Sequence, residues 1–92
     1  MAFIVVAYDI SSDRRRSKLH KRLKDYGEPV QYSVFECNLR PRQRRSLVRV
    51  IEENTRRKED RVRIYELCKK CKKKAAVIGE GRITEDSDSL FV

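Results

Sequence analysis

The sequence predicts an α+β protein of the ferredoxin-like βαββαβ class. Three observations carry this prediction: a short and almost wholly apolar first segment, two segments with apolar residues at helical spacing, and extended-type segments between and after them. Along the chain, the expected order is strand, helix, one strand or a strand pair, helix, strand and strand, as in this sandwich. The chain has 92 residues, enough for one small domain. We expect residues 1–79 to form that domain and residues 80–92 to form a C-terminal tail.

The first expected strand runs from Ala2 to Asp9 and is apolar at nearly every position. It is rich in β-branched residues and too short for a typical helix, which indicates a strand buried on both faces. Two helices cover only one face of such a sheet, so the second face needs another cover. We therefore expect a homodimer in which the two sheets pack face to face.

The first expected helix begins at residues 11–13, since Ser, Ser and Asp are typical of a helix start. Leu19, Leu23 and Tyr26 follow at helical spacing and give the helix an apolar side. Gly27 is expected to end it.

The next segment, Val30 to Leu39, is expected to be extended. It forms either one bent strand or two short strands that meet near Ser33. Pro41 suits the first turn of a second helix. The apolar residues that this helix would bury are Leu47, Val50 and Ile51.

Two further strands are expected after a charged connection that spans Arg56 to Asp60. One runs from Val62 to Leu67, and a shorter one from Ala75 to Ile78. The tail is then acidic until the apolar residues 90–92. These last residues either form a short strand that adds to an exposed sheet edge of the partner, or belong to a frayed end.

The charge of the chain favours a polyanionic partner. The formal net charge is +9, and the last thirteen residues contribute −3, so the first 79 residues carry +12. Nucleic acid is the commonest partner of such a basic domain. No aromatic pattern typical of single-strand binders is evident, so contact with the phosphate backbone is favoured over base reading. The side chains expected to contact nucleic acid are Arg14, Arg15, Arg16, Arg42 and Arg45.

A membrane is the rival partner for a basic protein. The sequence has no amphipathic segment with a broad apolar face and no apolar run of the roughly eighteen residues that span a bilayer. Three cysteines, an odd number, do not suit a secreted disulfide framework. We therefore expect a cytoplasmic protein with no membrane partner.

Asp9 stands at the exit of the first expected strand, directly before a dense basic segment. A carboxylate in this position can hold a hard divalent cation beside a phosphate-binding surface. The alternative is that it serves as an N-cap acid for the next helix. The sequence leaves both interpretations open.

The cysteines and the single histidine give weaker signals. Cys68 and Cys71 form a CxxC pair, but one such pair supplies only two of the four ligands that zinc prefers. Structural or incidental cysteines are the favoured interpretation, with a turn disulfide, zinc binding and a redox role as alternatives. His20 is expected to be solvated on a basic helix, and no triad partner accompanies it.

Several residues together resemble one family. Tyr8-Asp9-Ile10 closes the first strand, Arg16 follows seven residues after the aspartate, Lys18 follows two further on, and residues 31–35 read Gln-Tyr-Ser-Val-Phe. Over roughly residues 1–79, the chain is similar to the second of the two universal CRISPR-associated adaptation proteins.

The resemblance implies a ferredoxin-like homodimer that acts beside the CRISPR integrase subunit during spacer capture. Such a dimer bridges two integrase dimers and contacts the incoming DNA duplex. Several members are metal-dependent endonucleases on RNA, including single-stranded RNA, or on DNA. The resemblance further implies that Asp9 binds Mg²⁺ or Mn²⁺ together with the Asp9 of a second copy. The residues that match positions associated with nuclease activity are Tyr8, Asp9, Arg16, Lys18 and Phe35.

The chain departs from the family pattern at two positions. Pro29 stands where many relatives have a basic residue, and Lys18 stands where arginine is frequent, which removes a bidentate fork. Two functions therefore stay open: a metal-dependent endonuclease, and a non-catalytic DNA-binding scaffold for the integrase. The positive charge disfavours a metabolite-binding regulatory domain of the same fold.

Overall fold

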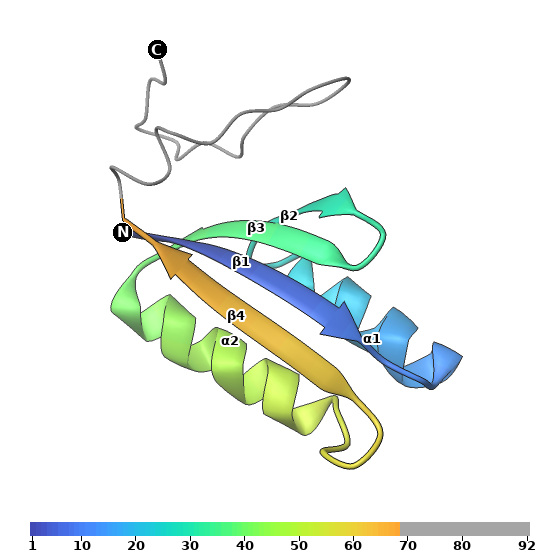
Figure 1. Ribbon diagram of the computed structural model, residues 1–92. Coiled ribbons are helices and arrows are strands. Elements are labelled where there is room, and N and C mark those ends of the chain that lie inside the picture. The colour runs from blue at the N-terminus through green and yellow to red at the C-terminus, as the bar shows by residue number, and fades with distance from the viewer. Residues whose placement is uncertain (69–92) are drawn as a thin grey trace.

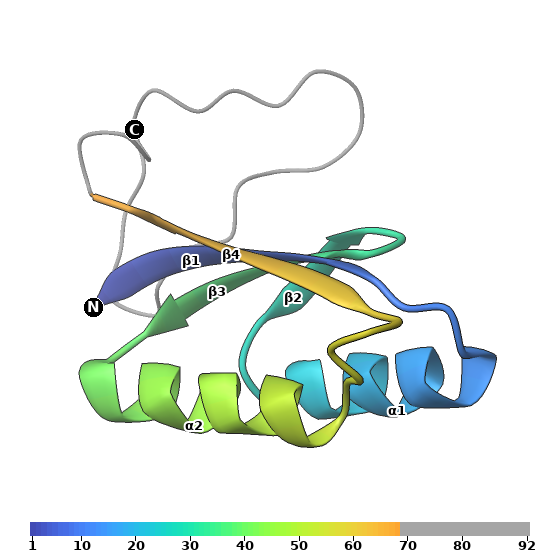
Figure 2. The same cartoon turned by 60° about the horizontal axis from the view of Figure 1, so that its bottom comes forward.

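Two helices lie against one face of a four-stranded antiparallel sheet in the computed structural model, which describes residues 1–68 (Figures 1 and 2). The sheet has the strand order β2-β3-β1-β4. This arrangement confirms the ferredoxin-like class that the sequence predicts. The elements are β1 (Ala2–Asp9), α1 (Asp13–Leu23), β2 (Glu28–Gln31), β3 (Val34–Leu39), α2 (Pro41–Glu53) and β4 (Arg61–Leu67).

Strand β1 is central and pairs with β3 on one side and β4 on the other. Its side chains alternate between the two faces of the sheet. Ile4, Val6 and Tyr8 are buried in the core beneath the helices, whereas Ala7 is only half-buried and Asp9 is exposed. One face of β1 thus contributes to the core beneath the helices, and the other face carries Ala7 and Asp9.

Helix α1 begins as its residue types predict. The Ser12 hydroxyl accepts a hydrogen bond from the Arg15 backbone N–H at 3.3 Å and so caps the helix. Leu19 and Leu23 are fully buried against the sheet. The helix ends at Leu23, and Lys24 is its C-cap.

Gly27 does not act as a left-handed helix terminator. Its backbone lies outside the left-handed region, and it follows a turn after the helix. A Cβ atom at this position would lie 2.2 Å from the Glu36 carbonyl oxygen and 2.5 Å from Cys37 Sγ. Glycine is therefore required because the chain passes close to β3, and the role expected from the sequence is corrected.

Helix α2 agrees closely with its prediction. Pro41 occupies the first turn, and the Arg40 backbone N–H donates to Gln43 Oε1 at 2.8 Å. The predicted apolar residues Leu47, Val50 and Ile51 are all buried.

The segment around Ser33 forms two strands, which resolves the alternative that the sequence left open. Strands β2 and β3 form a hairpin with an irregularity between Pro29 and Gln31. Every residue of β2 is exposed, as suits an edge strand that contains proline. Tyr32 lies in the turn of this hairpin.

The second face of the sheet carries no helix from residues 1–68 (Figure 2). Val5 and Val34 are half-buried there, and Tyr65 is 46% exposed. The inference that the two helices cover only one face of the sheet is confirmed. That a second copy covers the other face stays a prediction. The strand expected at 75–78, the tail at 80–92 with its apolar end, and Cys71 lie outside the described residues.

Candidate functional site

Asp9 is exposed at the end of β1. Strand alternation places it on the sheet face that neither helix covers, which we call the open face. Arg61 lies opposite it on β4, and Arg63 lies opposite Ala7. Within residues 1–68, Asp9 makes no ion pair and no side-chain hydrogen bond. It does not cap α1, because Ser12 does so. The N-cap alternative for Asp9 is therefore wrong, and Arg61 and Arg63 give positive charge to the part of the sheet around its carboxylate.

One copy of the chain offers few metal ligands at this position. The described residues contain no group of three or more His, Cys, Asp or Glu side chains that could hold a metal ion. Two Asp9 carboxylates from two copies would meet the usual requirement of Mg²⁺, which binds one or two carboxylates and keeps several waters. The donor set therefore fits a magnesium ion only in a dimer.

Tyr8 points to the opposite side of the sheet from Asp9 and joins an aromatic group beneath α1. Its hydroxyl lies 3.1 Å from His20 Nδ1, and its ring centroid lies 6.3 Å from that of Phe35. The His20 ring meets Phe35 edge-on at 5.0 Å. The expectation that His20 is solvated is therefore wrong. Its helix is basic, but its own side chain turns inward to Tyr8.

Burial raises the pKa of Tyr8, and Tyr32 raises it further, whereas Arg16 lowers it. The Tyr8 phenol accordingly keeps its proton at neutral pH and stays a hydrogen-bond donor. It is suited to holding the His20 ring in place.

Arg16 lies beside this aromatic group. Its guanidinium donates to the Ile10 carbonyl oxygen at 3.1 Å and forms an ion pair with Asp13. The hydrogen bond to Asp13 raises the pKa of Arg16. Its Cζ also lies 6.0 Å from the ring centroid of Tyr32. A pocket of about 330 Å³ lies beside Arg16. It is lined by Tyr8, Arg16, Ser17, His20, Gln31 and Tyr32.

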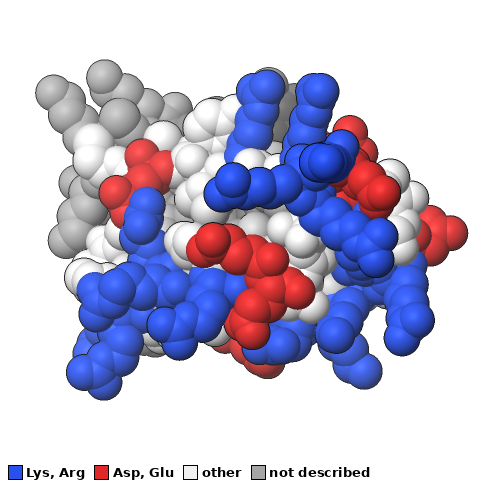
Figure 3. Space-filling model, turned by 90° about the horizontal axis from the view of Figure 1, so that it is seen from below, with Lys and Arg blue, Asp and Glu red and all other residues white. Residues whose placement is uncertain are grey.

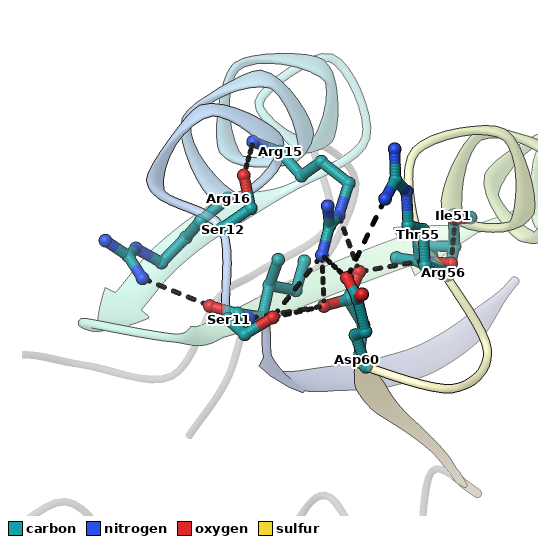
Figure 4. Close-up of polar contacts among 10 residues, drawn as sticks. Ser11, Ser12, Arg15, Arg16, Ile51, Thr55, Arg56 and Asp60 are labelled. Atoms are coloured by element: carbon teal, nitrogen blue, oxygen red, sulfur yellow. Dashed lines mark hydrogen bonds and ion pairs between the residues drawn. The ribbon is translucent and has the colours of Figure 1, made fainter.

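Arg15 has a different environment from its neighbour (Figure 4). Its Nε donates to Asp60 Oδ2 at 2.9 Å and its Nη2 donates to Asp60 Oδ1 at 3.0 Å. The Asp60 carboxylate also accepts the backbone N–H of Ser11 at 3.2 Å and that of Arg56 at 2.8 Å. Arg15 therefore ties the start of α1 to the connection before β4, and these contacts favour an internal role over phosphate contact.

The sequence does not single out Asp60, because it stands at the end of the charged connection from Arg56 to Asp60. Its side chain is fully buried. The Arg15 guanidinium holds the pKa of this carboxyl well below its usual range, although burial acts in the opposite direction. An acid directly before a strand is the available signal, but the sequence does not indicate which cation it meets.

Other basic side chains lie on the outer surface of the helices. Lys and Arg residues gather in groups on this side, with acidic side chains between them (Figure 3). Lys18 is exposed on α1 and does not line the pocket near Tyr8. The predicted nuclease residues are thus divided: Tyr8, Phe35 and Arg16 come together, whereas Asp9 lies on the other face. The predicted nucleic-acid contacts that are exposed on the helices are Arg14, Arg42 and Arg45.

The described cysteines have unlike surroundings. Cys37 is fully buried in the core, and burial raises the pKa of its thiol to about 11. It therefore stays protonated and inert at neutral pH. Cys68 is exposed at the end of the described chain. Within residues 1–68, no helix is long and apolar enough to cross a membrane.

Comparison with known proteins identifies the family. The family model described as CRISPR associated protein Cas2 matches residues 1–75. A Chloroflexus aurantiacus protein with the name CRISPR-associated endoribonuclease Cas2 1 is 40% identical over 91 residues, which are 98% of each chain.

Solved structures give the same result. A crystal structure of a hypothetical protein from Thermus thermophilus superposes with a TM-score of 0.79 at 40% identity, covering 91% of this chain and 98% of that one. A chain in a partial Cas6-RT-Cas1–Cas2 complex superposes with a TM-score of 0.68 at 32% identity, covering 85% of this chain and 91% of that one. On its sequence, its strand order and these matches, the chain belongs to the Cas2 family of CRISPR-associated proteins.

Proposed function

We propose that this chain acts in CRISPR adaptation as a homodimeric, metal-dependent endonuclease on RNA or DNA. The observation that carries the proposal is the position of Asp9, which is exposed and unpaired within the described residues on the sheet face without helices. Two copies that pack through this face bring two Asp9 carboxylates to one interface. The Chloroflexus aurantiacus relative, by its name an endoribonuclease, supports the choice of reaction.

The two Asp9 carboxylates would hold Mg²⁺ or Mn²⁺. When bound, such an ion lowers the pKa of a coordinated water and neutralises charge on the phosphate. The side chains of this chain supply the rest of the surface. Arg61 and Arg63 lie opposite the last residues of β1 and attract the phosphate backbone to the same face.

The test compares cleavage by wild type and Asp9→Asn, with and without Mg²⁺. We expect wild type to cleave only with the metal and the variant to lose cleavage while it still binds nucleic acid. Asp25→Asn is the matched control, because Asp25 is also exposed but lies after α1, away from the open face. Full cleavage by Asp9→Asn would assign the activity to another site or to a contaminant.

A second candidate function is a DNA-binding scaffold that joins Cas1 integrase dimers. It is supported by the similar chain in the Cas1–Cas2 complex and by the basic outer surface of the helices (Figure 3). This function needs a Cas1 partner and duplex DNA but does not need Asp9. Wild type that binds duplex and Cas1 yet cleaves nothing would favour the scaffold. If Asp9→Asn no longer associates with Cas1, the scaffold function is not independent of Asp9.

A further inference from the structure

Tyr32 is the most exposed large hydrophobic residue in the described chain, with 79% of its surface accessible. It lies in the turn between β2 and β3. Arg16 lies at one side of the ring, 6.0 Å from its centroid. An exposed ring beside a guanidinium is a common stacking platform for unpaired bases.

The ring borders the pocket of about 330 Å³ beneath α1. A volume of this order lies at the lower end of the range for small-ligand sites and suits a single base. The pocket also presents hydrogen-bonding groups: the Gln31 amide, the Ser17 hydroxyl and the His20 ring. These groups match the edges of a nucleobase, which carry both donors and acceptors.

His20 is oriented for such a contact. Its Nδ1 lies 3.1 Å from the Tyr8 hydroxyl, and Phe35 packs edge-on against the ring. Its Nε2 has no hydrogen-bond partner among residues 1–68. In the tautomer whose Nδ1 accepts from the Tyr8 phenol, Nε2 carries the ring proton and can donate it to a ligand.

We propose that this pocket binds one unpaired nucleobase of a single-stranded nucleic acid. The base stacks on Tyr32, and its flanking phosphate lies near Arg16. Bases inside a duplex are already stacked and paired, so duplex DNA cannot fill the pocket without base flipping. The site is therefore distinct from the backbone contacts that the basic helices favour.

The pocket is also separate from the proposed metal site. Tyr8 projects to the helix side of the sheet and Asp9 to the other side. Base binding requires neither a metal nor cleavage. Base binding can therefore be measured in the presence of EDTA, which prevents metal-dependent cleavage. Failure of this inference is then distinguishable from failure of the proposed endonuclease activity.

The first experiment measures binding of the full chain to a fluorescent single strand of about 12 nucleotides, to a blunt duplex and to an abasic strand of the same length. Tyr32→Leu retains an apolar side chain but removes the ring. We expect it to weaken binding of the base-bearing single strand by about 5- to 150-fold, since stacking contributes about 1–3 kcal/mol per base. Binding of duplex and of abasic strand should not change.

Two variants control this measurement. Tyr32→Phe keeps the ring and should bind the single strand as wild type does. Val30→Ala removes exposed apolar surface from the neighbouring edge strand and should also leave binding unchanged. An equal loss for single strand and duplex in Tyr32→Leu, or no loss for either, would overturn the proposal.

A second measurement uses wild type alone and so does not depend on the folding of any variant. His20 is the only histidine in the chain, so its imidazole proton signals are unambiguous in NMR. We expect the base-bearing strand to shift these signals and the abasic strand to leave them unshifted. Equal shifts with both strands would mean that phosphate contact alone explains the effect. If the His20 signals do not shift at a saturating concentration of the single strand, the base does not bind in this pocket.

Discussion

Arg15 and Arg16 are neighbours in a run of three arginines, yet they contribute to different parts of the structure (Figure 4). One helical position turns a side chain by about 100°, so adjacent residues face different surroundings. Arg15 turns to the buried Asp60, whereas Arg16 turns towards Tyr32. A run of like residues therefore does not form one phosphate-binding surface by its sequence alone.

Asp60→Asn is expected to lower the free energy of unfolding by about 1–3 kcal/mol, since charge-assisted hydrogen bonds from Arg15 are weakened at a buried position. The pKa of Asp60 is depressed in the folded state, so its stabilising effect is present above the ordinary carboxyl pKa of about 4. That effect is lost as the pH falls below this value. Urea unfolding at pH 6 and at progressively lower pH measures both quantities.

Glu59→Gln is the control for this experiment. Glu59 also pairs with Arg15, but its side chain is 50% exposed, so we expect a change within about 1 kcal/mol. Equal stability changes in the two variants would contradict the special role of the buried carboxylate. If the free energy of unfolding of Asp60→Asn falls in acid as steeply as that of wild type, the pH dependence comes from other groups.

The candidate site was only partly predictable at this scale. Asp9 could be placed at a strand exit, and its register on the open face follows from simple alternation. The inward turn of His20 could not be foreseen, because its partner Tyr8 lies twelve residues away on another element. Asp60 was missed for the same reason, since its cation lies 45 residues earlier in the chain.

At the scale of single elements, the chain between α1 and β2 is constrained by β3. Gly27→Ala is expected to lower the free energy of unfolding by about 1–3 kcal/mol, because the added Cβ overlaps the Glu36 carbonyl oxygen at 2.2 Å. Thermal or urea unfolding measures the change. Combining it with Cys37→Ala should not restore stability, since the nearest atom belongs to the backbone. Wild-type stability in Gly27→Ala would show that this segment moves away from β3 without cost.

The elements themselves were predicted where their signals are local. The buried residues of α2 repeat at helical spacing, and β1 is a short β-branched run. Strand β1 therefore has its expected bounds, and α2 has Pro41 in its first turn as expected. The break of the extended segment into β2 and β3 was not decided by local pattern. It depends on sheet pairing: β3 pairs with the distant strand β1 from Val34 to Leu39, whereas β2 pairs with β3 alone.

For the whole molecule, the positive charge predicts that duplex binding weakens strongly with salt. If six to ten phosphates are neutralised, affinity should fall by about 10³- to 10⁵-fold between about 50 and 200 mM salt. Arg42→Gln together with Arg45→Gln should reduce the slope of this dependence by about two, because each removes one phosphate contact. Fluorescence anisotropy at several salt concentrations measures the slope.

Arg15→Gln is the informative comparison for that slope. Because Arg15 is committed to Asp60, we expect this variant to lose stability without a change in the salt dependence of binding. If Arg15→Gln reduces the salt slope of binding as much as a surface variant does, Arg15 contacts nucleic acid as the sequence predicts. A flat salt dependence of wild type would contradict binding led by the backbone.

The sheet face that neither α1 nor α2 covers determines the assembly that we expect. Apolar side chains at its centre, including Val5 and Val34, lie on the side without helices, and a second copy provides a self-complementary cover. Light scattering should therefore give about twice the chain mass of 10.9 kDa, and the melting temperature should rise with protein concentration. Val5→Lys places a charge at the centre of this face and should shift the mass towards that of one chain. Arg45→Lys, on the helix side, should not. A mass of one chain for folded wild type at micromolar concentration would remove the dimer, and with it the pairing of Asp9 carboxylates on which the endonuclease proposal depends.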